Sequence, residues 1–285
     1  MTIQKVGIIG SGIMGSGIAE VAAKAGFDVV LRSRQQATAD AMVASLRKSL
    51  DRQVERGRIE QADADTVFAR VSATDALSAL ADCDLVIESV VEDLAVKRGL
   101  FAELDGICKE GAILATNTST LPIVEMAVAT SRPDKVVGIH FFNPAPAMAL
   151  VEIIAPLTAS QETVDTALEF AKNCGKDAVA VKDRAGFIVN ALLFPYLNNA
   201  IRMVETGTAT PEDVDTAMKA GCNFPMGPLA LLDLVGLDTS LSILDALYEE
   251  FRDPNYAAVP ALRRMVSAGL LGRKSGRGFY DYSKK

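Results

Sequence analysis

A glycine-rich turn near the start of the chain constrains its fold more than any other feature. The segment Gly10-Ser11-Gly12-Ile13-Met14-Gly15 has the spacing G-x-G-x-x-G. An apolar stretch precedes it at residues 3–9, a helical pattern follows from about residue 13 to residue 25, and a second apolar run covers residues 27–31. A strand, a glycine turn, a helix and a strand in this order predict a βαβ unit, which favours a parallel sheet.

Each glycine of this turn has a separate task in a dinucleotide site. The first permits the tight turn, the second lets a pyrophosphate approach the backbone, and the third lets the helix pack on the strand. The N-terminus of the helix then faces the anion. A plain tight turn is the alternative. We predict that five residues of this turn bind the dinucleotide: Gly10, Gly12, Ile13, Met14 and Gly15.

The end of the second predicted strand indicates which dinucleotide binds. An acid about 20 residues past the glycines would accept hydrogen bonds from the ribose diol of NAD. This chain has Arg32-Ser33-Arg34 there instead. A serine and an arginine suit a 2′-phosphate, to which they donate charge-assisted hydrogen bonds. Ser33 and Arg34 therefore favour NADP(H), with NAD(H) as the alternative if the arginines are only solvated.

The remaining pattern predicts two domains. Residues 36–69 are polar and helix-favouring and break near Gly57, which predicts a helical hairpin inserted into the nucleotide domain. Further strands are expected at residues 85–87, 112–115, 136–142, 151–154 and 178–181, and long amphipathic helical patterns run from residue 187 to residue 251. The predicted fold is α/β: a Rossmann-like sheet domain (1–183) with the hairpin insertion, followed by an all-α domain (184–285) for substrate binding and dimerisation.

Composition excludes several classes of protein. The 285 residues carry a formal charge of −7, which argues against nucleic acid or an anionic membrane as partner. The four cysteines are widely spaced and there is one histidine, so we expect neither a disulfide framework nor a metal site. The apolar pattern begins almost at Met1, which leaves no room for a signal peptide, and a cytoplasmic location is expected.

The single histidine is the leading candidate for acid–base chemistry. His140 lies in a short apolar segment, and twelve residues later Glu152 interrupts a second one. The two are equidistant from Pro146, so antiparallel pairing around that turn would place their side chains opposite each other. Histidine titrates near neutral pH, and a carboxylate fixes its tautomer and stabilises the imidazolium. We predict a proton-transfer pair; a buried histidine bonded only to backbone is the alternative.

Several further segments resemble the L-3-hydroxyacyl-CoA dehydrogenase family, in order and nearly end to end. Within this family the chain most resembles the short bacterial members, the 3-hydroxybutyryl-CoA dehydrogenases, and we expect no attached hydratase domain. The segments are Thr116-Asn117-Thr118-Ser119-Thr120, residues 138–144, Gly186-Phe187-Ile188-Val189-Asn190, Pro225-Met226-Gly227-Pro228, residues 236–239 and residues 274–280.

The resemblance implies an activity and a set of residue roles. The activity is reversible oxidation of (S)-3-hydroxyacyl-CoA, with short-chain substrates expected, to 3-oxoacyl-CoA, with hydride transfer to a nicotinamide cofactor. His140 corresponds to the general base and Glu152 to its orienting partner. Ser119 and Asn190 match the polar residues that hold the substrate oxygen and the catalytic water or nicotinamide. The positions that match cofactor contacts are Glu92, Lys97, Asn143 and Lys274.

Two of these residues have other readings when they are taken alone. Ser119 as a nucleophile would need a second histidine, so it is better interpreted as a hydrogen-bond donor, or as a helix N-cap before Pro122. Asn190 lies early in an apolar helical pattern, where its amide faces either a site or a neighbouring helix.

A basic face on the predicted hairpin is the candidate seat for coenzyme A. Ser45, Lys48, Arg52 and Arg56 have spacings that place them on one side of a helix, although acidic residues lie between them. The resemblance selects Ser45 and Arg52 as substrate-binding residues. A solvated charged face is the alternative.

Other functions remain open at this point. The acid that the family usually has after the second strand is replaced by Ser33, so the family's NAD preference does not carry over. A dehydrogenase of a free 3-hydroxy or sugar acid is the alternative enzyme, and a catalytically silent structural protein on the same fold is the alternative of another class. The apolar patterns of the helical domain predict a homodimer.

Overall fold

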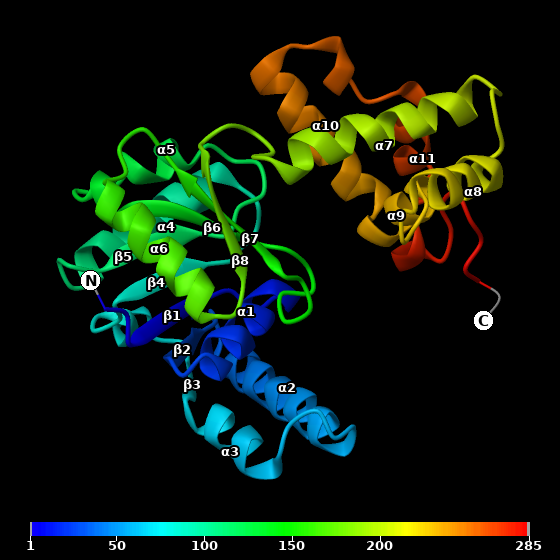
Figure 1. The fold of residues 1–285 in the computed structure, drawn as a ribbon. Coiled ribbons are helices and arrows are strands. Elements are labelled where there is room, and N and C mark those ends of the chain that lie inside the picture. The colour runs from blue at the N-terminus through cyan, green and yellow to red at the C-terminus, as the bar shows by residue number, and fades with distance from the viewer. Residues whose placement is uncertain (1, 284–285) are drawn as a thin grey trace. The chain divides into compact units, whose positions relative to one another are not determined.

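The protein is described by a computed structural model that covers residues 2–283. The chain divides into two compact units, one ending at Asp183 and the other beginning at Arg184. In Figure 1 the first unit runs from blue to green and contains the sheet, and the second runs from yellow-green to red and is helical. The expected order, an α/β unit followed by an all-α unit, is confirmed.

One eight-stranded sheet forms the centre of the first unit. Its order is β3-β2-β1-β4-β5-β6-β7-β8, and every neighbouring pair is parallel except β6 and β7. The strands are β1 (Lys5–Ile9), β2 (Asp28–Arg32), β3 (Val71–Thr74), β4 (Leu85–Glu88), β5 (Ile113–Thr116), β6 (Val136–Phe141), β7 (Leu150–Ala155) and β8 (Asp177–Lys182).

Six α-helices and two short 3₁₀ turns connect these strands. The helices are α1 (Ile13–Lys24), α2 (Gln36–Glu55), α3 (Gln61–Ala69), α4 (Leu94–Ile107), α5 (Ile123–Ala127) and α6 (Gln161–Asn173), and the 3₁₀ turns are η1 (Leu77–Leu80) and η2 (Pro133–Lys135). The predicted hairpin insertion is α2 and α3, which pack together through Leu46, Leu50 and Ala64. Arg47 fastens it further by an ion pair to Asp65, 2.6 Å long.

The alternation of side chains along the strands decides which face the candidate residues occupy. Ile139, Phe141, Val151 and Ile153 belong to one buried cluster with residues of α1 and α6. The residues between them therefore point to the opposite face. Gly138 confirms this, because a Cβ there would lie 2.4 Å from Ile123 of α5. His140 and Glu152 follow the same alternation and lie on the α5 face.

The strand β3 was not predicted from sequence. Its four residues, Val71–Thr74, are small or polar and only partly buried, with the pattern intermediate, exposed, intermediate, intermediate. It is the edge strand of the sheet and pairs only with β2. A short edge strand with little buried surface has no strong alternation to reveal it.

The second unit is built from five α-helices and two 3₁₀ turns. They are α7 (Val189–Glu205), α8 (Pro211–Cys222), α9 (Pro228–Val235), α10 (Leu237–Phe251), η3 (Pro254–Tyr256), α11 (Pro260–Ser267) and η4 (Arg273–Ser275). Their apolar faces meet around Phe194, Leu197, Leu232 and Leu244. None of the helices within residues 2–283 combines the length and the apolar character needed to cross a membrane.

Candidate active site

The glycine turn between β1 and α1 has the shape that a pyrophosphate requires. Gly10 has a φ of +125°, and a Cβ there would lie 2.2 Å from the carbonyl oxygen of Ser89. A Cβ on Gly15 would lie 2.2 Å from the carbonyl oxygen of Gly10, so both positions exclude a side chain. Gly12, which caps α1, has open space around its Cβ position. The turn therefore fits a phosphate group that approaches Gly12 at the helix N-terminus.

A cavity of about 560 Å³ lies at this turn. Gly10 and Gly12 line one part of it, and Arg32, Ser33 and Arg34 line the part at the end of β2. Ser33 is 5% exposed, whereas Arg34 is exposed, and Arg32 donates a hydrogen bond to the carbonyl oxygen of Asp75 at 3.2 Å. The lining also includes a carboxylate, Glu103, from α4. The cavity lining thus contains hydrogen-bond donors, Ser33 and Arg34, and one carboxylate, Glu103.

His140 and Glu152 form the predicted pair across β6 and β7. The two residues are directly opposite each other in the antiparallel register, and His140 Nδ1 lies 2.8 Å from Glu152 Oε2. His140 is 4% exposed and Glu152 is fully buried. The contact favours the tautomer in which Nδ1 carries the proton and donates a hydrogen bond to the carboxylate, so that Nε2 carries the lone pair.

The other ring nitrogen of His140 faces Ser119. The distance from Ser119 Oγ to His140 Nε2 is 3.1 Å, so the hydroxyl can donate a hydrogen bond to the lone pair of this nitrogen. Phe142 packs against the imidazole, with ring centroids 4.6 Å apart. The structure therefore brings together three predicted residues, Glu152, His140 and Ser119, in a row. Such a row can accept a proton at Nε2 and hold a positive charge on the ring.

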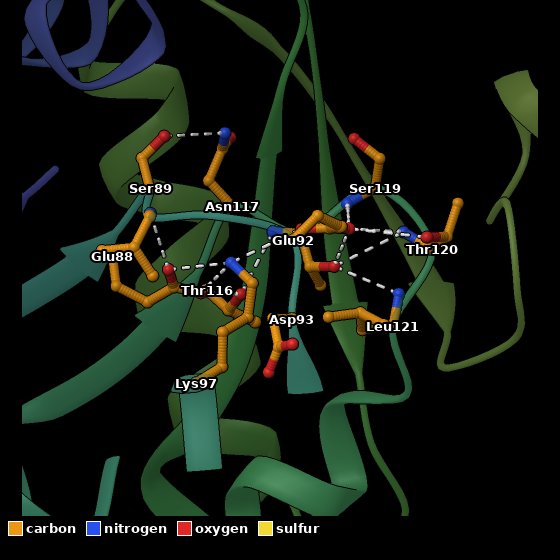
Figure 2. A network of polar contacts seen from close by, with 12 residues as sticks. Glu88, Ser89, Glu92, Asp93, Lys97, Thr116, Asn117, Ser119, Thr120 and Leu121 are labelled. Carbon is orange, nitrogen blue, oxygen red and sulfur yellow. Dashed lines mark hydrogen bonds and ion pairs between the residues drawn. The ribbon is translucent and has the colours of Figure 1, made fainter. Parts of the chain in front are cut away.

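Ser119 lies in a tight turn of residues 118–121, here called the Ser119 turn. Glu92, from the connection between β4 and α4, accepts hydrogen bonds from the backbone N–H groups of Ser119 at 2.9 Å and Thr120 at 3.3 Å. Thr118 also donates its hydroxyl to Glu92 Oε1. Figure 2 shows the Glu92 carboxylate among these donors. The carboxylate thus fixes the turn that carries Ser119.

Lys97 proves to be a buried cation. Its side chain is 1% exposed, and Nζ lies 2.7 Å and 2.8 Å from the two carboxylate oxygens of Glu88. Glu88 ends β4, is fully buried, and was not singled out from sequence. A signal was present: Glu88 closes an otherwise apolar strand at the edge where ligands of parallel sheets bind. The expected contacts of Glu92 and Lys97 with a cofactor stay predictions.

The connection between β6 and β7 is held in place from outside the pair. Phe141 N donates to Asn117 Oδ1 at 2.8 Å, and Lys176 donates to the carbonyl oxygens of Ala145 at 2.8 Å and Met148 at 2.7 Å. Asn143, an expected cofactor contact, is exposed in this connection. Sequence reasoning missed Asn117 as an anchor and Lys176 altogether, because their bonds join segments far apart in the chain.

Two predicted residues belong to the helical unit. Asn190 is 7% exposed at the start of α7. Lys274 Nζ lies 2.6 Å from Asp238 Oδ2. Burial acts to raise the pKa of the Asp238 carboxyl, but its hydrogen bond to Lys274 holds that pKa below the usual value. Within residues 2–283 no cluster of three or more metal-ligating side chains is present.

The candidate coenzyme A residues lie on the exposed side of α2. Ser45 and Arg52 are exposed, as are Lys48 and Arg56 of the same stripe. Arg47, on a different side of the helix, forms ion pairs with Asp51 and Asp65. The stripe is therefore available to an anion from solvent, and its binding role stays a prediction.

Comparison with known proteins identifies the family. Residues 5–184 match the model of the 3-hydroxyacyl-CoA dehydrogenase NAD-binding domain, and residues 186–282 match the C-terminal domain of the same family. A 3-hydroxybutyryl-CoA dehydrogenase of Mycobacterium tuberculosis is 50% identical over 282 residues, covering 98% of this chain and 99% of the relative. One from Clostridioides difficile is 49% identical over 281 residues, covering 99% and 100%.

Solved structures agree with the sequence relatives. The crystal structure of M. tuberculosis FadB2 has a TM-score of 0.96 at 50% identity and covers 99% of this chain and 100% of its own. That of (S)-3-hydroxybutyryl-CoA dehydrogenase PaaH1 from Ralstonia eutropha has a TM-score of 0.97 at 43% identity, with coverage of 99% and 100%. Both family models together span nearly the whole chain. This chain therefore belongs to the 3-hydroxyacyl-CoA dehydrogenase family.

Proposed function

We propose that this protein catalyses the reversible oxidation of a short-chain (S)-3-hydroxyacyl-CoA, such as 3-hydroxybutyryl-CoA, to the 3-oxoacyl-CoA. The observation that carries the proposal is the row Glu152–His140–Ser119, with contacts of 2.8 Å and 3.1 Å. The family and the names of the relatives support the substrate class. The glycine turn in the same unit supports a dinucleotide cofactor.

The mechanism follows from the two nitrogens of His140. Glu152 accepts a hydrogen bond from the Nδ1–H group, so the proton of the substrate 3-hydroxyl is taken up at Nε2. The imidazolium that results lies against the buried Glu152 carboxylate, which stabilises its charge. Ser119 donates a hydrogen bond to the substrate oxygen once the substrate replaces its contact with Nε2. A bound nicotinamide supplies the hydride acceptor. In the reverse direction His140 returns the proton to the oxygen.

Asn190 of the helical unit is a nearly buried amide at the start of α7. Its proposed role is the one that its match to the family implies, a polar contact to the substrate oxygen, the catalytic water or the nicotinamide. The apolar surface of the same unit, including Leu192 (73% exposed) and Met203 (43% exposed) on α7, supports a homodimer. A cytoplasmic location is part of the same proposal.

The cofactor is a nicotinamide dinucleotide, and we propose that it is NADP(H). Ser33 and Arg34 line the cavity where an acid would hold the ribose diol of NAD. Both side chains can donate to a 2′-phosphate. Glu103 in the same lining opposes this preference by its negative charge. NAD(H) is the alternative.

Coenzyme A is proposed to bind through Ser45 and Arg52 on α2. Both are exposed on the basic side of the helix, and an arginine offers a planar pair of donors to a phosphate. The acyl thioester itself would then extend toward His140.

One assay tests the proposed function. Acetoacetyl-CoA is mixed with the enzyme and either NADH or NADPH, and loss of the reduced nicotinamide is followed by absorbance. The comparison reactions are free acetoacetate with reduced cofactor and a free sugar acid with oxidised cofactor. Rapid oxidation of reduced cofactor by acetoacetyl-CoA is expected. Turnover of the free acids without acetoacetyl-CoA activity would contradict the proposed substrate, and no turnover of any of them would contradict the enzyme assignment.

A further inference from the structure

The buried ion pair between Glu88 and Lys97 is more than the fold of this region requires. Glu88 is fully buried and Lys97 is 1% exposed, so both charges are removed from water. The attraction within such a pair roughly offsets the cost of desolvation, and two apolar side chains of similar size often stabilise a fold as well. The pair therefore calls for a role that two apolar residues could not fill.

The contacts of Glu88 lead toward the Ser119 turn. Thr116, fully buried at the end of β5, donates its hydroxyl to Glu88 Oε1. The same hydroxyl oxygen accepts a hydrogen bond from the backbone N–H of Thr118 at 3.1 Å. Thr118 Oγ1 accepts in turn from Leu121 N, also at 3.1 Å. The end of β4 is thus connected to both ends of the turn.

Lys97 is connected to the same turn through a second carboxylate, Glu92. Its Nζ lies 3.5 Å from Glu92 Oε2, while Glu92 Oε1 accepts from the N–H groups of Ser119 and Thr120. One cation therefore contacts two carboxylates: Glu88 at the end of β4, and Glu92 in the β4–α4 connection, which accepts hydrogen bonds from the turn. Figure 2 shows Lys97 pointing up between Glu88 and Glu92, with the Ser119 turn beyond them.

We propose that Glu88, Lys97 and Thr116 are positioning residues that hold the Ser119 turn so that the Ser119 hydroxyl meets His140 Nε2. The proposal rests on the function proposed above, because its catalytic consequence is the placement of a substrate hydrogen bond. Glu88 and Thr116 are fully buried and act only through their neighbours. Lys97 contributes to the positioning through the two carboxylates, in addition to the cofactor contact that is predicted for it.

Two polar routes to one turn give a rigidity that packing alone does not. A turn of small polar residues buries little apolar surface, and its conformation is fixed chiefly by hydrogen bonds. Bonds to charged groups are the stronger ones. A displacement of about 1 Å in a catalytic contact can lower the rate about 100-fold. Precise placement of Ser119 is thus a sufficient reason for a buried charge pair beside it.

The first test uses the single histidine of the chain. In protein made without a histidine tag, the imidazole nitrogen resonances come from His140 alone. Thr116→Val, which keeps the side-chain shape, and Lys97→Met should move the Nε2 resonance toward its position in Ser119→Ala. Lys109→Met is the matched control, because Lys109 also pairs with an acid, Asp84, but at the other end of the β4 region. It should leave the resonance unchanged.

This readout needs no substrate, so it separates the proposal from the proposed function. If the wild-type protein does not reduce acetoacetyl-CoA, the proposed function is contradicted. The Nε2 resonance still measures whether the Ser119 hydroxyl is in contact with His140. If Thr116→Val and Lys97→Met keep a wild-type Nε2 resonance in folded protein, the positioning role is overturned. Thermal unfolding, recorded in parallel, identifies folded variants, and Thr116→Val is the variant least expected to unfold.

Kinetics supply the second test. Thr116→Val and Glu88→Gln should each lower kcat about 10-fold to 100-fold, with a smaller change in the KM for the reduced cofactor. In a Ser119→Ala background the same substitutions should lower kcat less than 3-fold, because the group that they position is gone. Equal losses in both backgrounds would show that the ion pair acts on the enzyme by a path other than Ser119, and would overturn the proposal.

Discussion

At His140 the two ring nitrogens have separate partners, and this separation gives each residue of the row its task. Nδ1 is 2.8 Å from a buried carboxylate, which fixes the tautomer, and Nε2 is 3.1 Å from a hydroxyl, which marks where a substrate oxygen can bind. At the end of β2, Ser33 offers a hydroxyl donor to the cofactor cavity in place of a carboxylate acceptor. We therefore expect single residues to determine both the proton transfer and the cofactor preference.

The cofactor preference can be reversed at two residues. Each charge-assisted hydrogen bond to a 2′-phosphate contributes about 1.5–3 kcal/mol. Ser33 and Arg34 should therefore favour NADPH over NADH by about 10-fold to 1000-fold in kcat/KM. Ser33→Asp with Arg34→Gln should favour NADH, because the donors are removed and a carboxylate repels the phosphate. Higher kcat/KM with NADH in the unmutated enzyme would show that Arg34 points into solvent.

At the scale of elements, the fold places polar groups where elements end. Glu88 ends β4, Thr116 ends β5, and His140 lies one residue before the end of β6. The carboxyl ends of adjacent parallel strands meet at one edge of a sheet, so these residues become neighbours although they are far apart in the chain. The hairpin of α2 and α3 is a separate element that presents a basic side to solvent.

The hairpin prediction is tested by Arg52→Ala. The KM for acetoacetyl-CoA should rise, because a guanidinium that binds phosphate is lost, while the KM for a truncated thioester without the nucleotide should stay the same. Thermal stability should also stay the same, because Arg52 is exposed. Lys219→Ala on α8, an exposed cation of the other unit, is the control. Equal changes for both thioesters would mean that the stripe is only a solvated face.

A buried carboxylate in the helical unit, Asp233, should make the stability of this unit depend on pH. Asp233 of α9 is 1% exposed and accepts hydrogen bonds from the N–H groups of Phe279 at 3.0 Å and Tyr280 at 2.9 Å. Burial raises the pKa of this carboxyl, and the charge of Asp215 raises it further. The native state therefore keeps the proton to a higher pH than the unfolded chain, and the contribution of Asp233 to stability falls as the pH rises through its native pKa.

Asp233→Asn removes this titration. The stability of the variant relative to wild type should therefore increase as the pH rises above about pH 4, the usual pKa of an aspartate, as measured by chemical unfolding at several pH values. A relative stability that falls over the same range would mean that the ionised carboxylate is the form favoured by the fold, and the predicted direction would be wrong.

Over the whole molecule, the sequence predicts the parts of the structure that depend on local pattern. The βαβ start, the hairpin at residues 36–69 and the helical unit are of this kind, and so is the pairing of His140 with Glu152, which follows from a symmetric turn. The edge strand β3 and the contact of Glu88 with Lys97 were missed. β3 buries too little apolar surface to show an alternation of apolar and polar residues. The ion pair depends on tertiary structure, because Lys97 reaches Glu88 only when α4 packs beside the end of β4.

Replacement of His140 shows whether this residue is the general base. His140→Ala should lower kcat for acetoacetyl-CoA reduction about 100-fold to 10,000-fold, which is the usual contribution of a positioned acid–base group. Binding of the reduced cofactor, followed by its fluorescence, should change little. Glu152→Gln should shift kcat in the same direction, because an amide does not stabilise the imidazolium. Wild-type kcat in a folded His140→Ala protein would contradict the account.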